Sequence, residues 1–342
     1  MQRAGVRPVV DSASLAVVGL VEVLSHIPRI HREFRKLVRA AEEERPDLAI
    51  LTDSPDFHLR LARRLKALGI PVIYLVAPQA WAWRKGRLPA MRQTIDQLLC
   101  IFPFEPDFFA PHGINARYIG HPLTRLVKPS AGPDELRRGF GVPGGTQLVA
   151  LLPGSRKGEI ERHLPVLIDA VKKIQTSHAS AARFILAVPP SVLGSNLRER
   201  ISETSIQVLE GRTWDVLACA DLALAASGTV TIEATLLGTP MIAFYRVNKL
   251  SWLMGKFLVR VPFYSMVNLV AGRRIVPELI QGDMTAGRLA DEALSLMRDD
   301  SAREAMRGEL RLVSQQLAGP EDPLDVAAQL VEKHLKEEMV HA

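Results

Sequence analysis

Cysteine is scarce in this sequence, which has only Cys100 and Cys219 among its 342 residues. Both lie inside apolar runs, so we expect buried free thiols, as in a protein of a reducing compartment. The chain has no CxxC pair and no Cys/His spacing typical of zinc. The sequence therefore predicts neither a disulfide framework nor a metal site.

The sequence also lacks an uncharged apolar run of the roughly 20 residues that a membrane-spanning helix needs. The run 13–24 contains Glu22, and the run 250–270 is interrupted by Lys256 and Arg260. The N-terminal residues do not form a signal peptide either. We therefore expect no spanning segment, although both runs are suited to touch a membrane surface.

Two further absences weigh against common function classes. No Gly-x-Gly-x-x-Gly motif follows a strand-like run, which argues against a Rossmann dehydrogenase. Aromatic residues make up only 6% of the chain, and no basic run is interleaved with them, so nucleic acid is a weak candidate partner. The net charge of +6 fits a merely basic soluble protein, or attraction to anionic lipid head groups or to a phosphorylated substrate.

What the sequence does contain is a regular alternation of strand-like and helix-like segments. Apolar runs typical of buried strands recur at 47–53, 71–76, 96–101, near 119, and at 147–152, 183–188, 206–209, 221–225 and 240–244. Strands that alternate with helices predict an α/β fold with parallel sheets. Such sheets bind ligands beyond the carboxyl ends of their strands.

The domain organisation follows from a break in this alternation. Proline and glycine gather between 127 and 145, which predicts a linker. We expect two Rossmann-like, doubly wound domains facing a cleft, at 1–127 and 146–284. A helical segment at 285–342 follows, and packing of this segment back onto the first domain is one arrangement open to it. The first domain has few strands before Asp53, so we expect it to be incomplete at its start.

Two loops in the second half carry the clearest functional signal. Residues 153–156 (Pro-Gly-Ser-Arg) and 226–229 (Ala-Ser-Gly-Thr) each follow a strand-like run and open a helix-like one. Free backbone N–H groups at a helix start suit a phosphate or diphosphate. Arg156 is suited to neutralise a diphosphate, and Glu233, one turn after Thr229, is suited to accept both ribose hydroxyls.

These residues also have plainer interpretations. Arg156 can be a solvated side chain near Glu159 and Glu161. Ser227, Gly228 and Thr229 can form an ordinary helix cap, and Glu233 can simply favour the helix dipole. The presence of Gly154, Ser155 and Arg156 in one loop and of Glu233 after the other favours a nucleotide diphosphate held at both ends.

Three residues of the first half are weaker candidates. Asp53 ends a strand, where its carboxylate can deprotonate an attacking hydroxyl or serve a turn or cap, while Asp56 fits the cap of the next helix. His121 fits phosphate contact or acid–base work, but a histidine packed at a hinge is the more ordinary role. Trp83 fits a cleft wall and core packing equally well.

The aromatic and apolar residues between 252 and 264 also admit two interpretations. They lie among Lys249, Lys256 and Arg260. The segment fits either a core helix or an interfacial segment for an acylated substrate.

Taken in order, the motifs of this chain resemble those of one family, the lipid-A-disaccharide synthases, which are glycosyltransferases with the two-domain GT-B fold. The resemblance covers nearly the whole chain. It rests on residues 18–24 (VGLVEVL), 53–57 (DSPDF), 78–84 (with Trp-Ala-Trp), 102–105 (FPFE), 120–123 (GHPL), 152–156 (LPGSR), 226–233 (ASGTVTIE), 267–273 (VNLVAGR) and 276–279 (VPEL).

The resemblance implies a reaction. UDP-2,3-diacylglucosamine donates its sugar to the 6-hydroxyl of 2,3-diacylglucosamine 1-phosphate, with inversion at the anomeric carbon and release of UDP. By the family's pattern Asp53 is the base, Arg156 and the 227–229 loop hold the diphosphate, Glu233 holds the ribose, and Asn268 matches another position important for activity. No cofactor or metal is implied.

The family also implies a setting and leaves alternatives. It implies a cytoplasmic protein of a Gram-negative bacterium, peripherally associated with the inner membrane, with a homodimer as an open question. The chain departs from the family at His58, where Asn is usual, and it lacks the family's opening strand and loop, so we expect reduced stability and little turnover. The alternatives are a UDP-N-acetylglucosamine 2-epimerase, an N-acetylglucosaminyltransferase or an inactive remnant.

Overall fold

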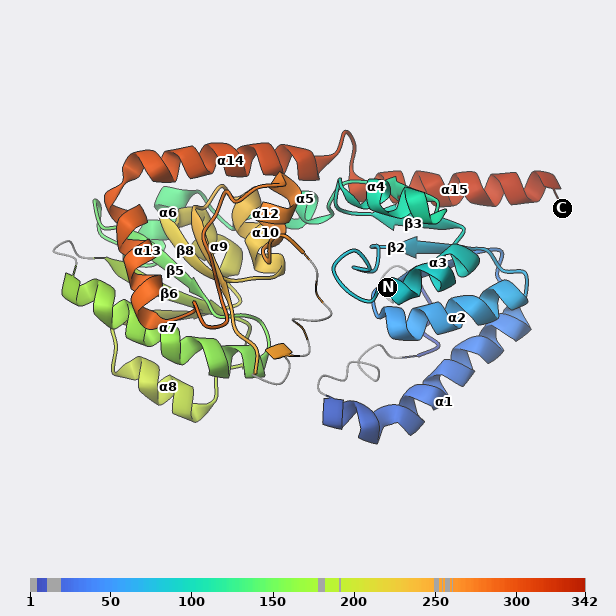
Figure 1. Ribbon diagram of the computed structural model, residues 1–342, viewed down its shortest axis with the longest axis horizontal. Coiled ribbons are helices and arrows are strands. Elements are labelled where there is room, and N and C mark those ends of the chain that lie inside the picture. Colours follow the sequence, from blue (N-terminus) through green and yellow to red (C-terminus); the bar gives the residue numbers. More distant parts are fainter. Residues whose placement is uncertain are drawn as a thin grey trace. The chain divides into compact units, whose positions relative to one another are not determined.

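The computed structural model describes residues 5–10, 20–177, 182–190, 192–248, 252–253, 255, 259 and 261–341. The chain divides into two compact units (Figure 1). The first unit comprises Met1–Ile119 together with Pro323–Ala342, and the second comprises Gly120–Asp322. No helix in the described part of the chain is long and apolar enough to cross a bilayer.

The first unit is a four-stranded parallel sheet with helices around it. The strand order is β1-β2-β3-β4, so each strand pairs with the next along the chain. Its elements are α1 (Leu20–Glu44), β1 (Ala49–Thr52), α2 (Pro55–Ala67), β2 (Val72–Leu75), η3 (Lys85–Arg87), α3 (Leu88–Thr94), β3 (Gln97–Cys100), α4 (Glu105–Phe109), η4 (Ala110–His112), β4 (Ala116–Tyr118) and α15 (Pro323–His341).

The second unit is a six-stranded parallel sheet in the order β10-β9-β8-β5-β6-β7. Its elements are α5 (Leu123–Leu126), α6 (Pro133–Gly139), β5 (Leu148–Leu152), α7 (Lys157–Ser177), β6 (Arg183–Val188), α8 (Ser195–Ser202), β7 (Ile206–Glu210), α9 (Thr213–Cys219), β8 (Leu222–Ala226), α10 (Thr229–Leu236), β9 (Met241–Tyr245), α12 (Met266–Ala271), β10 (Glu278–Ile280), α13 (Ala286–Arg298) and α14 (Asp300–Ala318).

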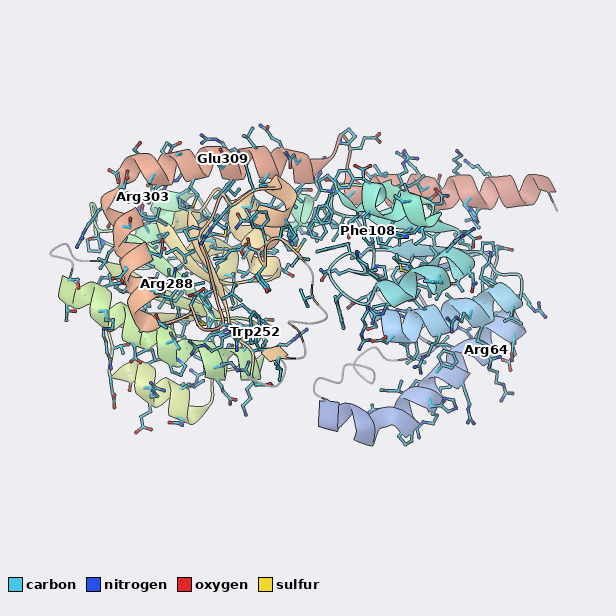
Figure 2. The ribbon with its side chains drawn as sticks, viewed as in Figure 1. Arg64, Phe108, Trp252, Arg288, Arg303 and Glu309 are labelled. Carbon is cyan, nitrogen blue, oxygen red and sulfur yellow. The ribbon has the colours of Figure 1, made fainter. Side chains whose placement is uncertain are left out.

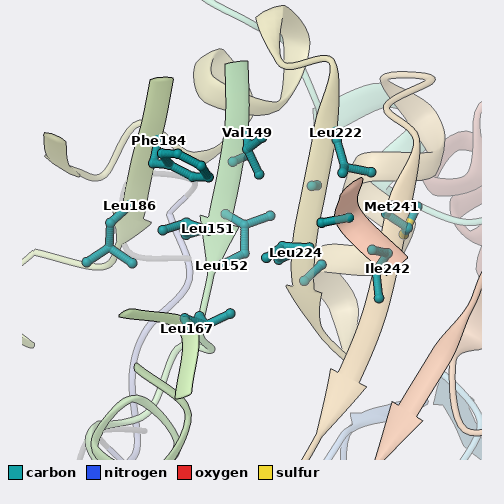
Figure 3. Close-up of a cluster of buried hydrophobic side chains, with 14 of the residues drawn as sticks. Val149, Leu151, Leu152, Leu167, Phe184, Leu186, Leu222, Leu224, Met241 and Ile242 are labelled. Atoms are coloured by element: carbon teal, nitrogen blue, oxygen red, sulfur yellow. The ribbon is translucent and has the colours of Figure 1, made fainter. Parts of the chain in front are cut away.

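The core of the second unit lies on both faces of its central strands. All five residues of β5 and all five of β8 are buried, which matches the unbroken apolar runs that parallel strands require. Leucines such as Leu151 and Leu224 meet side chains of neighbouring strands (Figure 3). Full burial of one such side chain contributes about 1.5–3 kcal/mol.

Helices cover both faces of this sheet (Figure 1). Helix α13 packs against α7 and against β8 and β9, while α9 packs against β5 and β6 and α10 against β8 and β9. The chain runs outward from β5 through β6 to β7 and then returns to the other side of β5 with β8. The boundary between β5 and β8 is therefore the topological switch point, where the loops after the two strands diverge and leave a crevice.

The predicted strands are confirmed to within two residues at their ends, and both cysteines are buried free thiols. Two elements differ from the expectation. The predicted linker at 127–145 contains α6, whose Arg137 pairs with Asp221 and donates to the Cys219 carbonyl at 2.8 Å. Strand β10 was not predicted, because three residues after a proline carry too little pattern to identify a strand.

A buried carboxyl group organises the loops at the carboxyl end of β3. The Glu105 side chain is fully buried and accepts hydrogen bonds from Ile101 N (3.1 Å), Phe102 N (3.0 Å) and Trp81 Nε1 (3.0 Å). The last bond ties the loop after β2 to the loop after β3. Burial raises the pKa of Glu105 to about 7, although its three hydrogen bonds act in the opposite direction.

We expect Glu105→Gln to destabilise the first unit by about 1–3 kcal/mol, because the amide NH₂ replaces an acceptor that faces an N–H donor. The wild-type carboxyl binds its proton more tightly when folded. It therefore lowers stability as pH rises from about 4.5 to about 7, a slope that the glutamine variant lacks. Urea unfolding at several pH values, followed by tryptophan fluorescence, measures both effects. Equal slopes for the two proteins would contradict the prediction.

Candidate active site

A cavity of about 490 Å³ lies at the switch point of the second unit. Its walls come from the loops after β5 and β8 and from the first turns of α7 and α10, as the strand order requires. The residues that line it include Gly154, Ser155, Arg156, Glu159, Ser227, Gly228, Thr229, Glu233 and Tyr245. The cavity thus brings together all seven residues that the sequence predicted for donor binding.

Glycine is required at position 154 in the first loop. Its φ of +123° is rarely adopted by other residues, and a Cβ placed there would lie 2.7 Å from Glu159 Oε2. That oxygen accepts long hydrogen bonds from Ser155 N (3.2 Å) and Arg156 N (3.3 Å). The expectation that these amides are free for a phosphate is therefore wrong, because a carboxylate of the same chain occupies them.

A second residue of α7, His163, forms a hydrogen bond to the same loop one helical turn after Glu159. His163 is fully buried, and its Nδ1 donates to the Pro153 carbonyl at 2.7 Å while its Nε2 lies 3.1 Å from Arg246 N and 3.0 Å from Arg246 O. Burial lowers the pKa of His163, although its hydrogen bonds to the Pro153 and Arg246 carbonyls act in the opposite direction. Glu159 Oε1 also accepts from the Tyr245 hydroxyl at 2.9 Å. The loop is therefore tied to the end of β9.

Arg156 is the cation that lines this cavity, and its side chain is exposed. Its guanidinium forms no ion pair or hydrogen bond with any residue that the structure describes. This exposed side chain also fits the plainer interpretation of a solvated arginine near Glu159, whose carboxylate accepts from Arg156 N, while Glu161 lies near Lys157 (3.9 Å). Arg156 is therefore available for a bidentate contact with a phosphate group.

The second loop differs from an ordinary cap. Gly228 holds the N-cap position of α10 and makes no side-chain cap. The Ser227 hydroxyl instead donates to the Tyr264 carbonyl at 2.7 Å, so the interpretation of Ser227 as a helix cap is wrong. The amides of Thr229 and Val230, the first two of α10, have no acceptor among the described residues, and both residues line the cavity, whereas the Thr231 amide donates to the Gly228 carbonyl at 3.0 Å.

Glu233 lies between two cavities. It lines the switch-point cavity and a neighbouring one of about 380 Å³, whose walls include Lys128, Arg212 and Trp214. Burial raises the pKa of its carboxyl, while a hydrogen bond from the Trp214 side chain favours the charged form. A half-buried carboxylate in this position can accept hydrogen bonds from vicinal hydroxyls.

Asn268 supports the site from behind. It is fully buried, and its amide donates to the Val276 carbonyl (3.0 Å) and to Glu278 Oε1 (2.8 Å). Its Oδ1 accepts from Ile275 N (2.8 Å) and Val276 N (3.0 Å). All its hydrogen-bonding capacity is used inside the protein, so this geometry gives it a positioning role and no contact with a substrate.

Glu278 continues this network toward the cavity. Its carboxylate also accepts from Tyr264 N (3.0 Å) and from the amide and hydroxyl of Ser265 (2.9 and 2.8 Å). The Tyr264 carbonyl in turn accepts the hydrogen bond from the Ser227 hydroxyl. Asn268 and Glu278 therefore fix the segment against which the 227–229 loop rests.

In the first unit, Asp53 lies in a strained turn at the carboxyl end of β1. Asp53 (φ 55°) and Ser54 (φ 40°) are both left-handed, as is Val76 directly after β2. Such conformations cost about 1–3 kcal/mol each and gather at functional sites. The Tyr74 hydroxyl (2.5 Å) and His58 Nδ1 (2.8 Å) both donate to the Asp53 carbonyl. The exposed Asp53 carboxylate has no hydrogen-bond or ion-pair partner among the described residues.

Trp83 is half-buried in a cationic cluster. The Arg84 and Arg87 guanidinium carbons lie 4.4 and 5.1 Å from its ring centroid, and both guanidinium groups pair with Asp56. Asp56 therefore serves as an ion-pair partner in the first turn of α2, and the expectation that it caps this helix is wrong. The half-buried position of Trp83 lies between the two predicted roles, an exposed cleft wall and core packing.

His121 is buried in the second unit. Its backbone N–H donates to Leu317 O at 2.8 Å, and its Nδ1 accepts from Leu123 N at 3.2 Å. Burial lowers the pKa of His121 to about 4, so the ring is neutral at pH 7. These contacts match the ordinary packed histidine better than acid–base work.

Two further predictions concern the basic residues of the aromatic segment and the absence of a metal site. Lys249, Lys256 and Arg260 of the aromatic segment lie outside the described residues. Among the residues that are described, no group of three or more His, Cys, Asp or Glu side chains is arranged to hold a metal ion.

Sequence reasoning missed Glu159, Trp214 and Glu278. An acidic residue in the first turn of a helix, as at Glu159, is a recognisable capping signal. Trp214 and Glu278 carried no local signal, because their partners lie far away in the sequence.

Comparison with known proteins places the chain in a family. The family model described as lipid-A-disaccharide synthetase matches residues 1–322. A lipid-A-disaccharide synthase of Solibacter usitatus is 54% identical over 341 residues, which cover 100% of this chain and 89% of that protein.

Solved structures show the same fold. A putative UDP-N-acetylglucosamine 2-epimerase from Listeria monocytogenes matches with a TM-score of 0.59 at 15% identity, covering 97% of this chain and 83% of that one. The S. aureus protein MnaA with UDP matches with a TM-score of 0.61 at 10% identity, covering 91% and 80%. These likenesses show the GT-B fold, and the sequence matches show that the chain belongs to the lipid-A-disaccharide synthase family of glycosyltransferases.

Proposed function

We propose that this chain transfers 2,3-diacylglucosamine from UDP to the 6-hydroxyl of 2,3-diacylglucosamine 1-phosphate, with inversion at the anomeric carbon. The observation that carries the proposal is the switch-point cavity, where Arg156, the α10 N-terminus and Glu233 converge. Family membership supports this reaction over the 2-epimerase and the N-acetylglucosaminyltransferase, because the family model and the 54% identical relative are both lipid-A-disaccharide synthases, whereas the L. monocytogenes 2-epimerase is only 15% identical.

The donor half of the mechanism rests on the second unit. The Arg156 guanidinium and the first amides of α10 neutralise the diphosphate, and this stabilisation grows as the bond from the anomeric carbon to the phosphate oxygen breaks. Glu233 accepts hydrogen bonds from the ribose. Asn268 and Glu278 act on this step only by holding the 264–278 segment behind Ser227.

The acceptor half rests on the first unit. Asp53 removes the proton from the 6-hydroxyl, whose oxygen attacks the anomeric carbon opposite the departing UDP. The strained turn presents the carboxylate while Tyr74 and His58 hold its carbonyl. Because both substrates carry acyl chains, we infer that the protein works in the cytoplasm as a peripheral protein of the inner-membrane surface.

We expect the chain to bind UDP in preference to ADP and GDP, and Arg156→Ala and Glu233→Ala each to weaken UDP binding roughly 10–100-fold. Each removes a charge-assisted hydrogen bond worth about 1.5–3 kcal/mol. Calorimetric titration measures the dissociation constants. The matched controls are Arg138→Ala and Glu135→Ala, whose side chains are exposed on α6. Equal binding of the three nucleotides would refute the donor assignment.

We expect Asp53→Asn to lower the rate constant of transfer about 10²–10⁴-fold, the usual contribution of a general base, without changing UDP affinity. The asparagine keeps the carbonyl that Tyr74 and His58 contact. Asp107→Asn, which removes an exposed charge from α4, is the control. The decisive measurement is single-turnover transfer with radiolabelled donor. A variant with near-normal transfer would rule out Asp53 as the base.

We expect Asn268→Ala to lower stability by about 2–4 kcal/mol, since it leaves buried amides and Glu278 without partners. A melting temperature lower by roughly 5–15 °C follows. UDP binding should weaken in parallel, measured well below the new melting temperature, and Ser227→Ala should weaken it without a comparable loss of stability. Full stability combined with lost transfer would instead show that Asn268 contacts a substrate.

A further inference from the structure

A groove of about 830 Å³ lies between α1 and α2 in the first unit. Figure 2 labels Arg64 where these two helices run side by side. The apolar part of the groove includes Ile30, Phe34 and Phe57, and the rings of the two phenylalanines pack edge to face at 5.5 Å. The polar part is dominated by Arg60, Arg63 and Arg64 of α2.

The three arginines form an uncompensated cationic cluster. Positions 60, 63 and 64 share one face of α2 because residues three and four apart are neighbours on a helix. All three side chains are exposed, and none forms an ion pair or hydrogen bond with a residue that the structure describes.

The acidic side chains around this cluster do not neutralise it. Asp56, which also lines the groove, pairs with Arg84 and Arg87. On α1, Glu33 is buried and pairs with Arg32 and Lys36. The arginine face therefore keeps a charge of about three positive units.

An apolar groove beside three unpaired guanidinium groups fits a ligand that joins hydrocarbon to phosphate. Guanidinium groups bind phosphate oxygens bidentately, and apolar side chains with adjacent basic residues are typical of surfaces that lie on anionic bilayers. Charge complementarity favours anionic lipids over neutral ones, and the clustering of the cations within about one helical turn suits head groups packed side by side.

We propose that the α1–α2 groove docks the protein onto a bilayer that contains anionic phospholipids. Ile30, Phe34 and Phe57 contact the acyl boundary, and Arg60, Arg63 and Arg64 bind head-group phosphates. This inference rests on the proposed function, which requires substrates that carry acyl chains, and it assigns the face of the protein that meets the membrane.

The test is co-sedimentation of the full chain with vesicles of phosphatidylethanolamine and phosphatidylglycerol, compared with vesicles of phosphatidylcholine alone. We expect the triple variant Arg60→Gln, Arg63→Gln, Arg64→Gln to bind the anionic vesicles on the order of 100-fold more weakly, at about 1 kcal/mol per arginine. Wild-type binding should fall at high salt. The variant Ile30→Ser should bind more weakly while keeping the salt dependence of the wild type.

The matched control removes the same charge elsewhere, through Arg117→Gln, Arg138→Gln and Arg183→Gln, three exposed arginines outside the groove. It should bind anionic vesicles nearly as the wild type does. Equal losses in the two triple variants would overturn the proposal, because they would show a general effect of net charge. Wild-type binding to neutral vesicles as strong as to anionic ones would overturn it as well.

Transfer measured with detergent-dispersed substrates separates this proposal from the proposed function. The groove variant should keep its rate there, since no bilayer is present. A groove variant that loses transfer in detergent would mean that the arginines bind the substrate and would overturn membrane docking. A wild-type chain that shows neither transfer nor selective UDP binding would contradict the proposed function, while vesicle binding would still decide the role of the groove.

Discussion

The pairing of β5 with β8 is the constraint on which the site of the second unit depends. The chain builds outward from β5 to β7 and then returns to the other side of β5 with β8, and right-handed crossovers on the two sides place the connecting helices on opposite faces of the sheet. The loops after β5 and β8 then turn toward opposite faces and leave a crevice between them. For this reason Arg156 and Glu233, which are far apart in the sequence, both line the same cavity.

Hydrogen bonds from backbone amides to two glutamates preorganise that crevice. Glu159 holds the 153–156 loop, and Glu278 holds the segment that supports Ser227. In each case a carboxylate satisfies amides that would otherwise be left without partners near the cavity. The first loop thereby loses its own amides as an anion site. In the proposed donor site, attraction for a diphosphate then depends on the Arg156 guanidinium and on the Thr229 and Val230 amides at the start of α10, which have no acceptor among the described residues.

The sequence predicted what local patterns encode. Unbroken apolar runs located the strands, because buried parallel strands must be apolar on both faces. Glycine at position 154 and the small residues at 227–229 located the loops. Asn268, by contrast, was predicted only from its motif. Its positioning role depends on hydrogen bonds to residues 275–278, and no sequence periodicity connects these residues to it. The carboxylate of Glu159 accepts hydrogen bonds from the loop amides, and this contact depends on the positive φ of Gly154, which the sequence does not give.

The acidic residues of this chain fall into two groups, and the difference between them separates positioning from reactivity. Glu105, Glu159 and Glu278 each accept two or more hydrogen bonds, which consume the lone pairs a base would need. In the strained turn, the Asp53 carbonyl accepts two hydrogen bonds, while the Asp53 carboxylate has no partner among the described residues. A carboxylate that is held by its backbone and unpaired at its oxygens is the arrangement that proton abstraction requires.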